Sequence, residues 1–205
     1  MDKPLFQKYI ELFLEANSKI NLISKNDEKF IWEKHIYDSL SFEKFLNKYG
    51  IKDLKNKTLL DIGTGGGFPS VPLAIKYPEL SVTALDSIKK KLNVIQSIKE
   101  DLGINNLSIL CDRAENIRGE KYDFITSRAV AALKILIPYA LPLLKKGGYF
   151  IAYKSVKVDE EIKEAQNILK KYQAKITDII PYNLPLDENY TRNLVILKHI
   201  NDKEI

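Results

Sequence analysis

The chain has 205 residues, of which 45% are hydrophobic and 29% charged, and its formal net charge at pH 7 is +5. This length suits one domain with its own core, and the composition is ordinary for a globular protein in water. The excess of positive charge is compatible with an anionic partner, but it does not identify one, because lysine-rich surfaces often serve only solvation.

The sequence contains one cysteine, Cys111, and two histidines, His35 and His199. A single cysteine cannot form an internal disulfide, and this set provides no zinc-ligand spacing, so we expect a reducing compartment and no metal. Cys111 ends an apolar run and is interpreted as a buried strand residue. The N-terminus is too charged for a signal peptide, and no apolar run is long enough to span a bilayer, which predicts a cytoplasmic protein without a membrane anchor.

The first 50 residues have helical periodicity. Apolar residues recur with helical spacing over residues 4–19, with Pro4 at a favoured first-turn position. A second helix is expected from about Asn26 through Asn47, and Tyr49-Gly50 ends it. We expect these helices to form an N-terminal extension, residues 1–50, of a single domain that covers residues 1–205.

From residue 51 onward, short apolar runs alternate with amphipathic stretches. The runs are Thr58–Ile62, Ser81–Leu85, Ser108–Leu110, Tyr122–Thr126, Tyr149–Tyr153, Ile176–Ile180 and Leu194–Leu197, and the helical candidates are Ser70–Tyr77, Lys89–Leu102, Ala132–Lys145 and Val158–Tyr172. This alternation predicts an α/β core over residues 51–205 with a seven-stranded, mostly parallel sheet covered on both faces. Gly147-Gly148 is expected to separate a helix from the next strand. The last two runs have no helix between them, so the last strand should be antiparallel.

A glycine-rich turn follows the first apolar run. It reads Asp61-Ile-Gly-Thr-Gly-Gly-Gly67 and continues into Phe68. Backbone without Cβ lets a ligand approach closely, and the following helix offers free amides. Dinucleotides require Gly-x-Gly-x-x-Gly, whose third glycine falls on Phe68, so an NAD enzyme is disfavoured. The pattern Asp-x-Gly-x-Gly-x-Gly is that of methyltransferases that use S-adenosylmethionine (SAM).

Two further acidic positions fit SAM. Asp86 ends the second strand and can accept hydrogen bonds from a ribose diol. The turn Asp112-Arg-Ala-Glu115 follows the third strand, where the adenine would lie. Taken alone, the glycine turn could be a tight strand–helix connection and Asp86 a solvated acid. Together they lie at the carboxyl ends of strands, where open α/β sheets bind ligands.

The sequence resembles one family in particular. The matching motifs are Asn21-Leu22, His35-Ile-Tyr-Asp-Ser-Leu40, Asp61 through Leu73, Leu85-Asp86-Ser87, Asp112-Arg-Ala-Glu115, Ser127-Arg-Ala129 and Tyr153-Lys154. They are similar to those of the glucose-inhibited division protein B family, the bacterial small-subunit ribosomal RNA guanine-N7 methyltransferases. The resemblance extends from about Asn21 to the last strand. It implies a Rossmann-like class I SAM-dependent fold, SAM as cofactor, and 16S ribosomal RNA or the small ribosomal subunit as partner; we expect a monomer.

The resemblance also implies site residues. The family's cofactor contacts fall on Gly63, Phe68, Ala114, Glu115 and Arg128. The turn and the second strand add Asp61, Gly65, Gly67 and Asp86 to the expected cofactor-binding set. Phe68 could contact the adenine or stack near the target base.

The loop after the fourth strand carries no base for proton removal. It reads Thr126-Ser-Arg-Ala129, without the acid and Pro-Pro of exocyclic amine methyltransferases. Guanine N7 bears a lone pair and no proton, so it needs positioning in line with the methyl–sulfur bond and no base. A donor to guanine O6 could orient the ring. The candidates are Arg128, Lys154, His35 and Arg192.

A structural alternative exists for each of three candidates: Arg128 could pair with Asp61 or Glu115, Lys154 could be a solvated strand end, and His35 could pack within its helix. Basic residues that could contact phosphate cluster at Lys89-Lys-Lys91, Lys145-Lys146, Lys154, Lys157 and Lys170-Lys171. The N-terminal helices could form part of an RNA surface or cover a sheet edge. Two other functions stay open: a methyltransferase with a small-molecule or protein substrate, and a non-enzymatic RNA-binding or ribosome-assembly factor.

Overall fold

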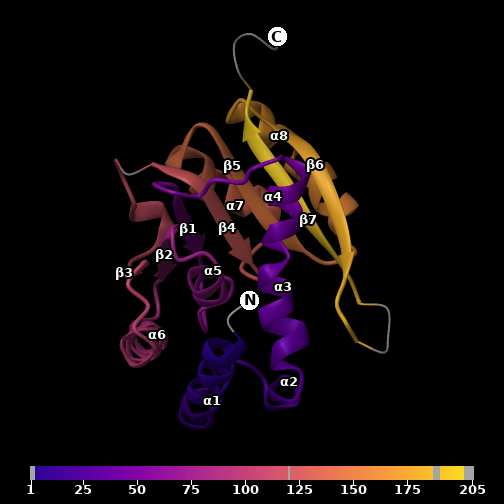
Figure 1. The fold of residues 1–205 in the computed structure, drawn as a ribbon. Coiled ribbons are helices and arrows are strands. Elements are labelled where there is room, and N and C mark those ends of the chain that lie inside the picture. Colours follow the sequence, from indigo (N-terminus) through magenta and orange to yellow (C-terminus); the bar gives the residue numbers. More distant parts are fainter. Residues whose placement is uncertain (1–2, 120, 187–189, 201–205) are drawn as a thin grey trace.

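The computed structural model describes residues 3–119, 121–186 and 190–200 (Figure 1). Within these ranges seven strands form one sheet in the order β3-β2-β1-β4-β5-β7-β6. The strands are β1 (Thr58–Ile62), β2 (Ser81–Asp86), β3 (Leu107–Cys111), β4 (Tyr122–Arg128), β5 (Leu144–Lys154), β6 (Ala174–Asn183) and β7 (Thr191–His199). Strands β1 to β5 pair in parallel, and β7 is antiparallel to both β5 and β6. The predicted sheet is confirmed.

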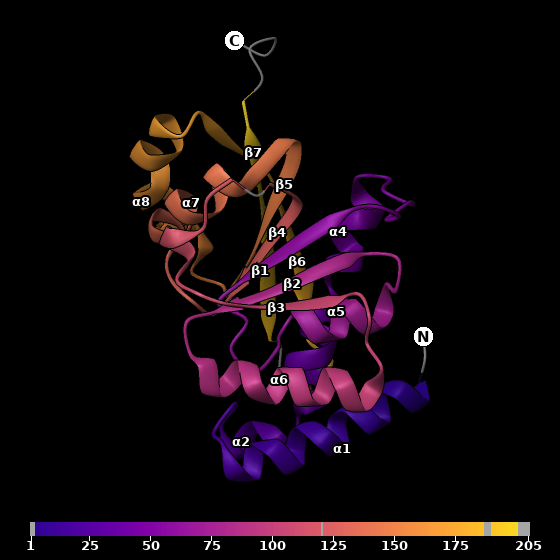
Figure 2. The same ribbon diagram turned by 90° about the vertical axis from the view of Figure 1, so that its left-hand side faces the viewer.

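The central strands are buried on both faces, as their nearly continuous apolar runs predict. Successive side chains alternate between the faces: Leu59 and Phe124 join one apolar cluster, and Leu60 and Ile125 join the other. Helices α5 (Ser70–Lys76) and α6 (Lys89–Leu102) cover the first face. Helices α7 (Leu133–Ala140) and α8 (Val158–Lys171) cover the second (Figure 2).

The second N-terminal helix is interrupted, which differs from the continuous helix predicted through Asn47. After α1 (Lys3–Lys19) the chain forms α2 (Lys25–Glu28), a π-helix η1 (Trp32–Tyr37), α3 (Asp38–Leu40) and α4 (Phe42–Lys48). The wide π turn changes which backbone groups pair, and the carbonyl of Lys34 accepts a hydrogen bond from Arg128 instead. Periodicity alone does not predict this contact, because Arg128 lies on a strand that is distant in the sequence.

The N-terminal helices cover a face of the sheet. Phe42 and Phe45 pack edge-on against Phe124, with ring centroids 5.7 and 5.9 Å away, and the Tyr153 hydroxyl donates to the Ser39 carbonyl. The sheet edges are β3 and β6, and Lys48 at the end of α4 pairs with Asp178 of β6, so the alternative that these helices cover an edge holds in part. They cover strands that α5 and α6 leave open, while α1 packs outside α6 (Figure 2).

The connection between α7 and β5 also differs from the prediction. The helix expected to reach Lys145 ends at Ala140, a short 3-10 helix η3 (Leu141–Leu143) follows, and Gly147-Gly148 lies inside β5. The pairing register with β4 shifts at this point. Gly147 has φ +80°, and a Cβ on Gly148 would lie 2.7 Å from the Asp123 carbonyl oxygen. The two glycines therefore permit a bulge.

The cysteine prediction is also wrong. Cys111 is exposed, because its strand β3 lies at the edge of the sheet. Among the helices that the structure describes, none is both long and apolar enough to cross a membrane.

Candidate active site

Asp61 is buried below the glycine turn and holds the turn in place by hydrogen bonds. Its carboxylate accepts hydrogen bonds from the Thr126 hydroxyl (3.0 Å) and the Ser70 amide (3.3 Å), so it ties the end of β1 to β4 and to the start of α5. Its complete burial raises the pKa of Asp61 to about 6. The sequence predicts that Asp61 binds the cofactor, but Asp61 does not line the cavity above the turn. It supports the turn instead.

Two glycines in the turn have no space for a side chain. Gly63 has φ +72°, and a Cβ there would overlap Cγ2 of Val130; Gly67 has φ +92°, and a Cβ would lie 2.7 Å from Cγ2 of Val71. Gly63 and Gly65 line the cavity above the turn, whereas Gly67 does not. The first glycines thus leave room beside a ligand, and the third lets α5 pack closely.

Asp86 faces the same cavity from the end of β2. One carboxylate oxygen accepts the Gly65 amide at 2.8 Å, and the other accepts the Ile88 amide at 2.9 Å. A carboxylate oxygen can accept more than one hydrogen bond, so Asp86 retains capacity for a diol. Ala114 and Glu115, in a 3-10 turn after β3, line the cavity as well.

The first cavity, as we call this space above the glycine turn, has a volume of about 670 Å³. That volume is in the range of small-molecule sites. The structure therefore places Gly63, Gly65, Phe68, Asp86, Ala114, Glu115 and Arg128 around one space, as the sequence predicted.

Phe68 borders the first cavity, but its ring is almost entirely covered, with 4% of the residue exposed. The ring packs against Phe13 and His35 with centroids 5.1 and 5.0 Å away, and Cζ of Arg128 lies 5.2 Å from its centre. Phe68 therefore stays a lining residue of the first cavity, but α1 and η1 cover most of its ring. It supports the guanidinium of Arg128.

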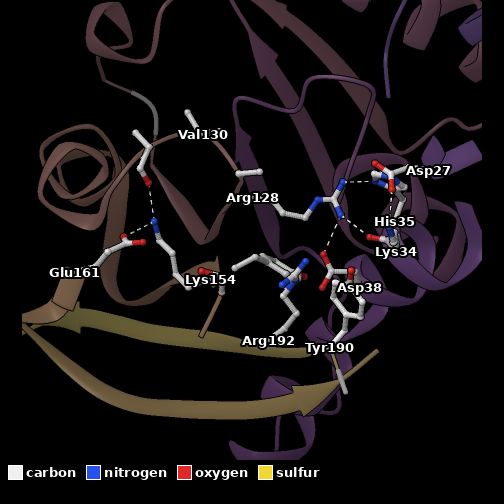
Figure 3. A pocket seen from close by; sticks show the side chains of 14 residues that line it. Asp27, Lys34, His35, Asp38, Arg128, Val130, Lys154, Glu161, Tyr190 and Arg192 are labelled. Carbon is white, nitrogen blue, oxygen red and sulfur yellow. Dashed lines mark hydrogen bonds and ion pairs between the residues drawn. The ribbon is translucent and has the colours of Figure 1, made fainter. Parts of the chain in front are cut away.

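Arg128, at the end of β4, is held by three groups of the N-terminal segment. Its Nη1 donates to the Lys34 carbonyl (3.0 Å) and to Oδ2 of Asp38 (2.9 Å), and its Nη2 lies 2.9 Å from Nδ1 of His35 (Figure 3). A guanidinium can only donate, so Nδ1 accepts and the imidazole proton lies on Nε2. Arg128 therefore pairs with Asp38, and not with Asp61 or Glu115, the two partners considered from the sequence.

The Arg128–Asp38 pair is largely buried, with side chains 15% and 5% exposed. Oδ1 of Asp38 also accepts the hydroxyl of Tyr182, at 2.6 Å. Burial, and next the positive charge of Arg128, lower the pKa of His35 to about 4. His35 is therefore neutral at pH 7. Its Nε2 has no hydrogen-bond partner among the described residues.

Lys154 is buried, with 8% of the residue exposed, and is not the solvated strand end of the structural alternative. Its Nζ donates to the Ala131 carbonyl (2.6 Å) and pairs with Oε2 of Glu161 (2.7 Å). The same Glu161 oxygen accepts the amide of Leu133, the first residue of α7 (3.0 Å). Lys154 therefore fixes the loop between β4 and α7.

A second cavity of about 560 Å³ lies beside the first, and Arg128, Lys154, His35 and Arg192 all line it (Figure 3). The structure thus brings together the four residues that the sequence proposed as donors. Both cavities are bordered by Arg128, Ala129 and Val130. The loop after β4 is the wall that they share.

Sequence reasoning missed several residues of the second cavity. Asp38 lies within the motif His35–Leu40, and its place in that motif could have marked it as a site residue. Glu161 stands seven positions after Lys154, close enough in the chain for an ion pair to be considered. Nothing in the sequence marks Tyr190, whose ring lies 5.8 Å from Cζ of Arg192.

Several of the basic clusters lie away from this site. Lys145 and Lys146 are at the start of β5, and Lys170 and Lys171 at the end of α8, whereas the cavities adjoin the carboxyl end of β5. Within the described ranges, no group of three or more His, Cys, Asp or Glu residues could hold a metal ion.

Comparisons with known proteins agree with this geometry. A family model described as GidB, rRNA small subunit methyltransferase G, matches residues 2–195. "Ribosomal RNA small subunit methyltransferase G" of Staphylococcus saprophyticus is 40% identical over 94% of this chain and 80% of the relative. The protein of the same name from a Thermoanaerobacter species is 39% identical over 96% of this chain and 82% of the relative.

Solved structures match the fold at low sequence identity. An S-adenosylmethionine-dependent methyltransferase from Clostridium acetobutylicum superposes with a TM-score of 0.62 at 16% identity, over 86% of this chain and 99% of that chain. This likeness supports the fold alone. Because the family model spans most of the sequence and the relatives share about two residues in five, the chain belongs to the GidB family of rRNA small subunit methyltransferase G proteins.

Proposed function

We propose that this protein transfers a methyl group from SAM to N7 of one guanine in 16S ribosomal RNA. The supporting observation is that, in the part of the chain that the structure describes, every carboxylate lining the second cavity is paired with a cation. Its carboxylates Asp27, Asp38 and Glu161 each pair with a cation, at 2.7, 2.9 and 2.7 Å, and Nδ1 of His35 faces Arg128. No acceptor in this set is free to remove a proton, and N7 carries none to remove.

SAM is assigned to the first cavity, where it supplies an electrophilic methyl group. The turn from Gly63 to Gly65 leaves bare backbone for the amino-acid end, and Asp86 accepts the ribose hydroxyls. Ala114 and Glu115 border the adenine. This assignment fits the cavity's volume and its lining residues.

The target guanine is assigned to the second cavity, with its N7 and O6 edge toward the wall shared with the first. Arg128 lies at that wall, and three of its five N–H groups are used by Lys34, Asp38 and His35. We assign a remaining N–H of Arg128 to guanine O6. His35 and Lys154 are then positioning residues: one orients the guanidinium and the other fixes the shared wall. Catalysis here consists of orientation and exclusion of water.

Chemical cleavage mapping of N7-methylguanine in ribosomal RNA tests the reaction. Cells lacking this protein should lose one cleavage site, and expression of the protein should restore it. An unchanged pattern would rule out the reaction. Transfer of labelled methyl groups to metabolites alone would instead support a small-molecule methyltransferase, and RNA binding without SAM binding in calorimetry would support an assembly factor.

The same proposal includes a monomer that acts in the cytoplasm, where the small ribosomal subunit is assembled. Light scattering during gel filtration tests the first part, because a dimer would elute at twice the mass of the 23.5 kDa chain. Comparison of naked 16S RNA with isolated small subunits as methyl acceptors shows which of them is the substrate.

A further inference from the structure

The second cavity holds one more cation than it holds carboxylates. Its cations are Lys34, Arg128, Lys154 and Arg192, and its carboxylates are Asp27, Asp38 and Glu161. Each carboxylate pairs with one of the first three cations. Among the described residues no carboxylate pairs with Arg192, the fourth cation, which lies at the start of β7.

Arg192 is the end of a row in which cations and aromatic rings alternate. Lys34 Nζ lies 5.1 Å from the ring centre of Phe30 and 5.6 Å from that of Tyr190, and Cζ of Arg192 lies 5.8 Å from the Tyr190 centre. Lys29 adds a cation beyond Phe30, at 4.9 Å. The row joins the N-terminal segment to the start of β7, two parts of the chain that are distant in sequence.

Tyr190 connects the second cavity to the surface. It lines the cavity together with Lys34 and Arg192, yet 37% of the residue is exposed. The exposed part of the ring is therefore accessible to a ligand from the surface. Figure 3 shows Tyr190 and Arg192 beside Asp38, across the cavity from the Lys154–Glu161 pair.

The position of N7 on the guanine ring favours an unpaired target. N7 lies on the major-groove edge, which is too deep and narrow in an RNA helix for side chains to reach. The target base must therefore lie in an unpaired segment or leave its stack, and in both cases the neighbouring base can stack on the protein. Proteins that bind unpaired strands replace such stacking with aromatic rings or arginine planes and contact the phosphates with cations.

We infer that Tyr190 and Arg192, with Phe30 and Lys34 behind them, bind the nucleotide next to the target guanine in an unpaired RNA segment. Its base stacks on the Tyr190–Arg192 pair, and its phosphate contacts Arg192. We call these four residues the stacking platform. The inference rests on the proposed function, because it takes the second cavity as the place of the guanine.

Kinetics of methyl transfer to small subunits or 16S RNA, with SAM affinity measured separately, tests the platform. Tyr190→Ala is expected to raise the KM for RNA by about tenfold, the order found for loss of one stacked base. The SAM dissociation constant should stay within about twofold, because Tyr190 does not line the first cavity. Tyr190→Phe, which keeps the ring, should restore most of the lost affinity.

Arg192→Gln is expected to weaken binding of a short unpaired oligoribonucleotide and to reduce the slope of log K against log salt by about 0.7, the value for one phosphate contact on a single strand. The matched control is Lys171→Gln, which removes one charge from the end of α8, away from the cavities. The control should leave the affinity for the oligoribonucleotide and the salt slope unchanged. Arg192→Lys should retain the salt slope but lose the plane on which the base stacks.

Each outcome separates the platform from the reaction. If Tyr190→Ala binds SAM normally and keeps the wild-type KM for RNA, the platform is overturned and the reaction stands. If the wild type methylates no RNA but binds the oligoribonucleotide in a Tyr190-dependent way, the reaction is overturned, and with it the placement beside a target guanine, and only a surface that binds unpaired RNA is left. A loss of SAM binding in Tyr190→Ala would show general damage to the fold, and would equally overturn a role confined to RNA.

Discussion

The two cavities meet at one loop but are built in different ways. The first is made mainly from backbone turns at the ends of β1, β2 and β3, where glycines and the amide-bound Asp86 set the shape. The second is made from side chains of the N-terminal segment, β4, β5, α8 and β7, held by buried ion pairs. Local conformation therefore decides the first cavity, whereas the second depends on pairs in which each charge needs its partner.

Loss of Arg128 should have the largest effect on the second cavity. Arg128→Ala leaves Asp38 as a buried carboxylate without a counter-charge, and it leaves the Lys34 carbonyl without this donor. Removal of one partner of a buried pair costs about 3–5 kcal/mol. Urea unfolding should show this loss, and methyl transfer should fall below detection.

The control for Arg128 is the exposed pair Lys134–Glu164, whose side chains are 48% and 56% exposed. Lys134→Ala should cost less than about 1 kcal/mol, because water screens an exposed pair. Equal losses of stability in the two variants would contradict the view that the buried pair holds the second cavity.

One methyl group added at Gly63 should disrupt the first cavity. Gly63→Ala puts a Cβ against Val130 at a residue with φ +72°, and Val130, which is 46% exposed, can relieve the clash only by moving at the wall of the cavity. We expect SAM affinity to fall by about tenfold or more, measured by calorimetry, with a loss of stability of about 1–2 kcal/mol from the positive φ.

Gly50→Ala is the matched control, because Gly50 has φ +64° and a Cβ added there would meet nothing within 4 Å. It should show the same backbone cost with unchanged SAM affinity. If the control loses SAM affinity too, the loss comes from general destabilisation and the close approach at Gly63 has no special role.

A smaller effect is expected at the loop shared by the cavities. Glu161→Gln leaves the buried Lys154 without its carboxylate, and weakens the acceptor for the Leu133 amide. Because the Glu161 side chain is 25% exposed, we expect a loss of about 1–2 kcal/mol, below that of a fully buried pair.

Hydrogen exchange is the sharper measurement at this loop, and the amide of Leu133 should exchange faster in Glu161→Gln. Glu164→Gln, one turn further along α8 in an exposed pair with Lys134, provides the control. Unaltered protection of Leu133 would show that the Lys154–Glu161 pair does not hold the loop.

The last prediction concerns pH. The folded pKa of His35 is lowered to about 4, below the unfolded value of 6.5, so the folded state binds this proton less readily. The stability from neutral His35 is complete above pH 6.5 and is lost as pH falls toward 4. In contrast, burial raises the pKa of Asp61 to about 6, which favours folding at low pH.

Comparison with His35→Gln isolates the histidine, since Asp61 is present in both proteins and cancels. The stability advantage of the wild type over the variant should narrow as pH falls from 7 to about 4.5. Denaturant unfolding at several pH values measures it. A difference that does not vary with pH would mean that His35 is not kept neutral by burial beside Arg128.

The burial of individual residues shows where prediction from the sequence ends. Phe68 lines the first cavity, but the sequence does not show that α1 and η1 cover most of its ring. Cys111 ends an apolar run, yet it is exposed because β3 is an edge strand. In both cases the local pattern is correct, and the neighbours that decide burial come from distant parts of the chain.

The sequence by itself determined the alternation of strands and helices, the antiparallel last strand and the glycine turn with its acid at Asp86, because periodicity and backbone conformation are local properties. Only the tertiary structure decided that Asp38 receives Arg128, that Glu161 receives Lys154, and that Tyr190 lies beside Lys34 at the second cavity. Those choices depend on which charges and rings become neighbours after folding, and a buried charge is tolerated only where its partner arrives with it.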